Sequence, residues 1–166
     1  IIMAVISPGG VIQVVYWDSE TVTNVTSANS EWAIGASQSP TLTTKADNSN
    51  FIYCVTLGAE SDLTATTNGF FRLTYTTNNF SSTDYVNSNE CQVAGMTFDN
   101  VSGTNDHCIV TSYSGSHVAG TNIRFRLNFT KSTSPSYQFN QQGLTGQPSN
   151  TGNSAYGYVM EIGAWF

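Results

Sequence analysis

Charged side chains are scarce in this chain of 166 residues, which contains five Lys or Arg, eleven Asp or Glu and two His. The formal net charge is −6 and the pI is near 4.5. Because affinity for nucleic acid is built mainly from clusters of Lys and Arg, this balance predicts no nucleic-acid partner. Arg124 and Arg126 are the one close basic pair, and their spacing predicts that both lie on the solvent face of a strand.

Long apolar runs are also missing. No run approaches the ~20 residues that a membrane-spanning helix needs, and no charged-then-apolar signal peptide opens the sequence, so we expect no membrane insertion. Apolar residues at the helical spacing i, i+3, i+4 and i+7 do not persist over any helix-length stretch, which predicts almost no helix.

Cysteines are few. Cys54, Cys91 and Cys108 cannot all pair within one chain, and a domain of this size does not need disulfides to fold. We therefore expect free thiols on strands, with a bridge between Cys91 and Cys108 as the alternative.

Neutral polar residues are abundant instead, with 42 Ser or Thr and 16 Asn around short stretches in which apolar and polar residues alternate. In the clearest stretch, alternation with period two places Ile123, Phe125, Leu127 and Phe129 on one face of a strand. This pattern predicts an all-β protein, an antiparallel β-sandwich or jelly roll. Firm strands are expected at residues 11–17, 51–57, 70–76, 91–98, 108–113, 122–130 and 156–165, and weaker ones at 21–26 and 31–34.

The chain length fits one domain with one core. We expect residues 10–166 to form a single β-sandwich head domain, and residues 1–9 to be an N-terminal lead-in segment or the end of a stalk. The strand at 11–17 is apolar on nearly both sides, which predicts that both sides are covered. The longest irregular stretch, residues 133–154, is expected to be functional or stabilised by a partner chain.

No catalytic constellation stands out. Asp106 and His107 could join one of many serines, but no G-x-S-x-G turn exists to expose a nucleophile. The close carboxylate pairs fit ordinary surface charge, and the oxygen-rich loop 99–106 lacks EF-hand spacing. No zinc-type spacing of Cys and His occurs. We therefore predict a protein that is not an enzyme and that has no catalytic residues, no cofactor and no resident metal.

Aromatic residues in polar stretches are the best binding candidates. Tyrosine among Asn, Ser and Gly is typical of adaptable recognition surfaces. The residues predicted to contact a receptor are Tyr85, Tyr113, His117, Tyr137 and Tyr156.

Three short motifs stand at the two ends and in the middle of the chain: Gly9-Gly10-Val11-Ile12-Gln13-Val14-Val15, Phe71-Arg72-Leu73 and Tyr158-Val159-Met160-Glu161-Ile162. They resemble a recurrent domain at the ends of phage tail fibres and similar appendages. Its usual layout is a G-x-[IV]-[IL]-Q-V-V start, a middle Phe-Arg-Leu strand and a late strand ending in M-E-I. The cysteines and the segment 133–154 are not part of that layout.

The resemblance implies a homotrimeric, receptor-binding knob on the virion surface, in contact with other virion proteins and with a host glycan or protein. A surface rich in hydroxyls and amides suits weak, multivalent glycan binding, because three sites in one trimer raise avidity. Two alternatives remain open at this stage. One is a structural virion protein, such as a capsid decoration or head-fibre component. The other is a glycan depolymerase or esterase tip.

Overall fold

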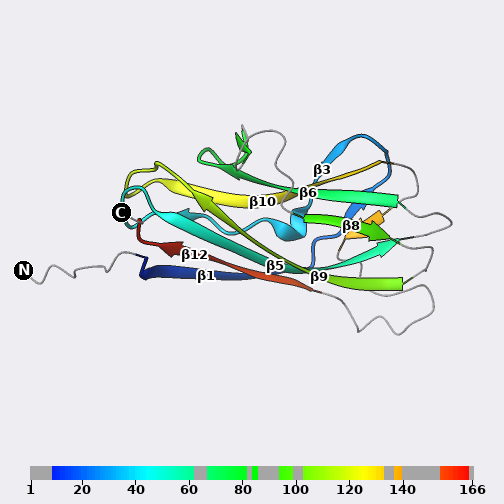
Figure 1. The fold of residues 1–166 in the computed structure, drawn as a ribbon, viewed down its shortest axis with the longest axis horizontal. Coiled ribbons are helices and arrows are strands. Elements are labelled where there is room, and N and C mark those ends of the chain that lie inside the picture. Colours follow the sequence, from blue (N-terminus) through cyan, green and yellow to red (C-terminus); the bar gives the residue numbers. More distant parts are fainter. Residues whose placement is uncertain are drawn as a thin grey trace, which may run out of the picture.

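Two antiparallel sheets pack face to face, as the computed structural model shows (Figure 1). The structure describes residues 9–61, 67–81, 84–85, 94–98, 103–132, 137–139 and 154–164. The predicted all-β sandwich is confirmed. Within the described ranges the one helical piece is a 3₁₀ turn, η1 (Gly35–Ser37), and no helix there is long and apolar enough to cross a membrane.

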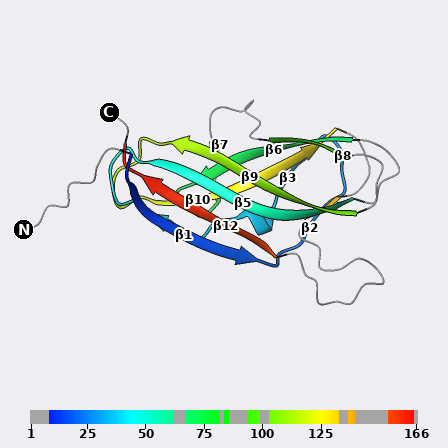
Figure 2. The same ribbon diagram turned by 60° about the horizontal axis from the view of Figure 1, so that its bottom comes forward.

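The first sheet is built around β5 and β12. Strand β1 pairs with β12, β12 with β5, and β9 with the other edge of β5, as Figure 2 lets the reader follow. Strand β11 pairs with the C-terminal end of β5 and carries β2 on its other side. The six strands are β1 (Val11–Ser19), β2 (Thr23–Val25), β5 (Asn50–Ser61), β9 (Gly103–Ser114), β11 (Tyr137–Phe139) and β12 (Ala155–Ile162).

The second sheet is built around the pair β10 and β6. Strands β3 and β4 share one edge of β10, while β7 and β8 share the far edge of β6. The six strands are β3 (Glu31–Ala33), β4 (Leu42–Thr43), β6 (Thr67–Thr76), β7 (Asp84–Tyr85), β8 (Ala94–Phe98) and β10 (Asn122–Lys131).

The core lies between the sheets and follows the predicted alternation. The four apolar inward side chains of β10, Ile123, Phe125, Leu127 and Phe129, are all fully buried. The rings of Phe129 and Phe139 meet edge to face at 4.8 Å, which joins the two sheets across the core.

Ser37 and Ser39 take the place of a strand beside the middle of β10. Their hydroxyl oxygens accept the backbone N–H groups of Leu127 at 2.8 Å and Phe125 at 3.0 Å. The backbone carbonyls of Leu127 and Phe125 accept from the backbone N–H groups of Ile34 and Ser39, respectively. Between β3 and β4, therefore, side-chain hydroxyls help to complete the hydrogen bonding that a buried strand edge requires.

A buried carboxylate fixes the loop between β4 and β5. Glu161 of β12 is fully buried and accepts the backbone N–H groups of Lys45 at 2.8 Å and Ala46 at 3.2 Å. It also accepts the Ser49 hydroxyl at 2.7 Å and the side-chain amide of Gln13. Charge-assisted hydrogen bonds of this kind compensate for burial of the carboxylate.

Several boundaries differ from the prediction. Strand β5 does not end at Gly58 but continues to Ser61, and β9 begins at Gly103 inside the expected loop, because these two segments pair with each other along their whole lengths. Part of the expected irregular stretch 133–154 is strand β11. Residues 1–8, 91–93, 99–102 and the remainder of 133–153 lie outside the described part of the chain.

The described part of a single chain covers β1 on one side only. Val15 and Trp17 pack against the core, but Tyr16 on the opposite side is 73% exposed. The predicted cover of the second side is therefore not supplied by the described residues of one chain.

Candidate functional site

All three arginines of the chain lie on the outer side of β6 and β10. We call this surface the arginine face and define it by Arg72, Thr74 and Thr76 on β6 with Arg124, Arg126 and Asn128 on β10. The strand register pairs Arg124 with Thr76, Arg126 with Thr74, and Asn128 with Arg72. Since directly opposite residues in an antiparallel pair share a face, cations, hydroxyls and an amide are collected on one surface.

A tight turn after β6 borders this face. The Thr76 hydroxyl donates to Asn78 Oδ1 at 2.8 Å and accepts the backbone N–H groups of Asn78 and Phe80. Asn79 and Phe80 both have positive φ, at 58° and 62°. Asparagine tolerates this conformation, whereas a bulky residue such as Phe adopts it at a cost of about 1–3 kcal/mol.

Cation–π contacts of the Phe80 ring offset this conformational cost. Its ring centroid is 4.0 Å from Cζ of Arg126 and 5.6 Å from Cζ of Arg124. Cation–π contacts at such distances are attractive, more so where the guanidinium is partly withdrawn from water. Burial and the neighbouring charge of Arg124 both lower the pKa of Arg126, as expected for two close cations.

Arg124 is held by neutral acceptors. Its Nε donates to the carbonyl of Ser39 at 3.1 Å and its Nη1 to Asn79 Oδ1 at 2.5 Å. With its amide in the orientation that satisfies both side chains, Gln38 accepts hydrogen bonds from Nη1 and Nη2 of the same guanidinium through its side-chain oxygen. In the described ranges, neither Arg124 nor Arg126 forms an ion pair with a carboxylate.

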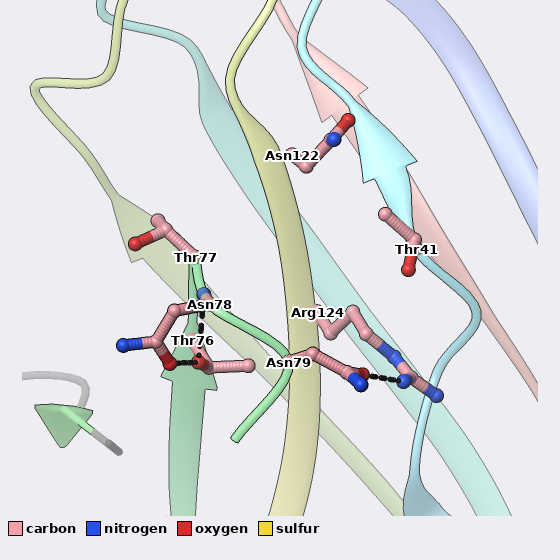
Figure 3. A pocket seen from close by; sticks show the side chains of 7 residues that line it. All are labelled: Thr41, Thr76, Thr77, Asn78, Asn79, Asn122 and Arg124. Carbon is pink, nitrogen blue, oxygen red and sulfur yellow. Dashed lines mark hydrogen bonds between the residues drawn. The ribbon is translucent and has the colours of Figure 1, made fainter. Parts of the chain in front are cut away.

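A pocket of about 380 Å³ opens beside Arg124 (Figure 3). This volume lies in the range of small-molecule sites, roughly 300–1,000 Å³. The turn after β6 forms one wall and Arg124 lies opposite it, with Asn79 pointing toward the guanidinium. The pocket is lined by Thr41, Thr76, Thr77, Asn78, Asn79, Asn122 and Arg124. We call it the Arg124 pocket.

The described lining residues offer donors and acceptors but no side chain that titrates near neutral pH to act as an acid or base. Asn122 Oδ1 accepts from the Thr43 hydroxyl at 2.8 Å, which orients its amide. No carboxylate, imidazole or thiol is among the lining residues. Over the described ranges, no three His, Cys, Asp or Glu side chains lie close enough to hold a metal ion.

A second hollow, of about 480 Å³, lies where β5 begins and β9 and β12 end. It is lined by Asn48, Asn50, Ser114, Gly115, Ser116 and Ala164. Because it has no charged side chain to fix an orientation, it is the less specific of these two hollows.

Two of the residues predicted to contact a receptor come together. The Tyr113 hydroxyl and His117 Nε2 are 2.9 Å apart, and the Tyr75 ring stacks on Tyr113 at 4.7 Å. Tyr113 is not an exposed side chain as expected but is half-buried against Phe51 of the core. Burial lowers the pKa of His117, which therefore stays neutral near pH 7.

Tyr156 lies on a different surface, the outer side of the first sheet, where it is 60% exposed. We call this surface the tyrosine face. It is defined by Val14 and Tyr16 of β1, Tyr156, Tyr158 and Met160 of β12, Ile52 and Cys54 of β5, and Cys108 and Val110 of β9. The rings of Tyr16 and Tyr158 are 5.9 Å apart.

Strand pairing gives the positions of the two remaining residues predicted to contact a receptor. Tyr85 lies in β7 opposite Thr74 of the arginine face, and Tyr137 lies in β11 opposite Ser61. The side chains of both are outside the described part of the structure.

Cys54 and Cys108 are free thiols on adjacent strands of the tyrosine face. Burial and the interaction with Cys108 raise the pKa of the Cys54 thiol. Cys91, the suggested partner of Cys108, lies outside the described residues.

Comparison with known proteins identifies no family for this chain. No family matches the sequence, phage fibre families included, and no curated protein is significantly similar. Among solved structures, the chain is similar to the CBM22-1 and GH10 modules of Clostridium thermocellum endo-1,4-β-D-xylanase 10B complexed with xylohexaose, with 9% identity and a TM-score of 0.35. The similarity covers 83% of this chain but 26% of that one, so the chain spans about a quarter of that structure.

A second similar structure is the CBM22-1 xylan-binding domain of Paenibacillus barcinonensis Xyn10C. It has 10% identity and a TM-score of 0.28, with 96% of this chain and 98% of that chain covered. At such low identities and TM-scores, neither likeness is an argument for what this chain binds.

Proposed function

We propose that this chain is a glycan-binding β-sandwich domain without catalytic activity, and that the Arg124 pocket is its binding site. The composition of the pocket supports this proposal. The exposed hydroxyls of Thr41 and Thr77, three asparagine amides and one guanidinium line the pocket, and these groups match the hydroxyls and ring oxygens of a sugar. The polar groups come from three segments of the fold, so the folded scaffold fixes their spacing before a ligand arrives.

Blocking the pocket tests this function. Thr77 is exposed and lines the pocket, so Thr77→Trp should fill it while leaving the core intact. We expect wild type to bind members of a panel of neutral and acidic polysaccharides in calorimetry, and Thr77→Trp to lose at least tenfold in affinity. Thr26→Trp, at an exposed threonine outside the pocket, is the matched control and should bind as wild type does. Equal affinity of wild type and Thr77→Trp would contradict the assignment.

A more specific proposal is that this chain is part of a virion. Its support is the sequence resemblance, to which the fold adds one observation. Two of the three motifs pair as neighbours, because Val11 lies opposite Ile162 and Val14 opposite Met160 in strands β1 and β12. We propose a receptor-binding head domain on the surface of a phage particle, with a host cell-surface glycan as partner. Inhibition of phage adsorption by the purified domain would support it, whereas imaging that finds the chain within the capsid lattice would favour the structural virion protein.

The trimer proposal draws on the tyrosine face. Two cross-strand rows, Tyr16–Tyr158–Cys54–Val110 and Val14–Met160–Ile52–Ser112, contain no charged residue. Tyr16 and Val110 are 73% and 58% exposed. The next row of the same face, Asp18–Tyr156–Thr56–Cys108, has one carboxylate at its edge. The two uncharged rows let copies of a chain with net charge −6 approach each other, and contiguous exposed apolar surface marks an interaction site. A single species of monomer mass, 17.9 kDa, at micromolar concentration would exclude the trimer.

A further inference from the structure

The Arg124 pocket has an excess of positive charge, although the chain as a whole is acidic. Three of its five Lys or Arg residues gather on the arginine face, and the net charge is −6. An acidic protein that concentrates its arginines on one small surface has a local potential opposite to that of the rest of the molecule.

The two arginines nearest the pocket lack a counter-ion among the described residues. Arg124 donates to the carbonyl of Ser39 and to the amide oxygens of Asn79 and Gln38, and Arg126 lies over the ring of Phe80. These partners position both guanidiniums without neutralising them. Arg126 Nε is shielded from water and has no hydrogen-bond partner in the described part of the chain.

From this arrangement we infer that the pocket selects acidic glycans, with the carboxylate of a uronic acid residue bound by the guanidinium of Arg124. This inference rests on the proposed function and names the class of glycan. A carboxylate would supply the missing negative charge. It would replace the amide oxygens of Asn79 and Gln38 at the planar guanidinium fork, which matches its two oxygens. The threonine and asparagine side chains around Arg124 would then bind the hydroxyls of the same sugar.

A nucleic acid is a weaker candidate for the same charges. Binding of a phosphate backbone needs a row of cations, whereas two guanidiniums beside one pocket fit a single acidic group.

The test compares one polymer in two charge states. Polygalacturonate and its fully methyl-esterified form have the same backbone and differ in the carboxylate. We expect wild type to bind polygalacturonate at least tenfold more tightly than the ester in calorimetry, and to lose this preference as salt is added. Equal affinity for both would overturn the inference and leave the proposed function standing, while binding to no glycan at all would overturn both.

Variants of Arg124 test whether this residue causes the preference for polygalacturonate over its ester. Arg124→Gln should weaken binding of polygalacturonate by about 10- to 100-fold, because hydrogen bonds to charged groups are strong, and should weaken binding of the ester much less, because the ester has no carboxylate to lose. Arg124→Lys should restore part of the affinity, since it keeps the charge but loses the fork. Lys45→Gln removes the same charge from an exposed position outside the pocket and should behave as wild type.

Three further results would contradict the inference. Arg124→Gln could retain wild-type affinity for polygalacturonate, with its fold checked by thermal unfolding. Dextran sulfate could bind more tightly than polygalacturonate, which would assign the pocket to sulfate groups. Single-stranded DNA could bind as tightly at the same ionic strength, which would indicate a general anion surface. The comparison of the two polymers on wild type remains decisive even if a variant fails to fold.

Discussion

The two outer faces of the sandwich differ in chemistry although the two sheets share one core. The tyrosine face carries Tyr16, Tyr158 and Met160 on closely paired strands. The arginine face carries Arg124 and Arg126 among threonines and asparagines. Both sheets alternate inward and outward residues, so the core fixes one side of each strand and leaves the other free to vary. In this protein the free sides differ in the partners that they suit, namely apolar surface on one face and a polar, anionic ligand on the other.

A carboxylate in the middle of the tyrosine face should have the largest effect. Met160→Glu places a charge between Val14 and Ile52, and a buried unpaired charge would strongly oppose association. We expect the mass in light scattering to fall from that of the proposed trimer to that of the monomer, 17.9 kDa, with glycan binding per chain unchanged.

Val118→Glu is the control for this change. Val118 is 64% exposed and lies outside the tyrosine face, so the same substitution there should leave the trimer intact. If both variants stayed trimeric, the tyrosine face would not be the subunit contact. If Met160→Glu also abolished glycan binding per chain, the two faces would not be independent.

Substitution of Glu161 tests whether the two sheets are stabilised by a contact that they share. It belongs to β12 of the first sheet but holds the loop that follows β4 of the second. Glu161→Ala leaves the donors of Lys45, Ala46 and Ser49 without their acceptor, and should lower the free energy of unfolding by about 3 kcal/mol. Urea denaturation would measure the loss. The exposed Glu20→Ala serves as control, and a loss similar to that of the control would refute the role of Glu161.

On the arginine face, Phe80→Leu should cost about 1 kcal/mol in urea denaturation, because the apolar side chain remains but the cation–π contacts with Arg126 and Arg124 are lost. Phe80→Tyr keeps an aromatic ring and should retain most of the stability. Equal stability of the Leu variant and wild type would mean that the ring does not stabilise the cations.

The smallest expected effect concerns the thiols of the tyrosine face. Cys108 is one cause of the raised pKa of Cys54, so Cys108→Ser should lower that pKa toward its ordinary value. The thiolate fraction of Cys54 near pH 8 would then rise, since a lower pKa favours the charged form, and alkylation should become faster. Peptide mapping by mass spectrometry follows Cys54 specifically, and the Met160→Glu background keeps the face accessible. An unchanged rate would contradict the coupling of the two thiols.

The sequence predicted the interior well and the surface poorly. Alternation at 123–129 predicted which side chains of β10 are buried, because period two is a local property. The same rule could have placed Tyr113 inward, since it shares a side of β9 with the buried Ile109. The polar neighbours Ser112 and Ser114 favour an exposed Tyr113, whereas its place in the alternation favours an inward one.

The Arg124 pocket was beyond sequence reasoning. The outward direction of Arg124 and Arg126 was predicted and fits their half-buried positions opposite the inward stripe. Asn79, however, reaches Arg124 from 45 residues away through a turn with positive φ, and the sequence did not predict that turn. The third arginine joins the face through the register of β6 with β10, which is fixed by the folded sheet.

The serines beside β10 also determine how copies of this protein can meet. A strand edge with unpaired N–H and C=O groups is a template for another chain, and such edges lead to open-ended aggregation. The middle of β10 is closed to this route, because Ser37 and Ser39 already occupy the N–H groups of Leu127 and Phe125. At that position, two short hydroxyl side chains protect the molecule against strand addition.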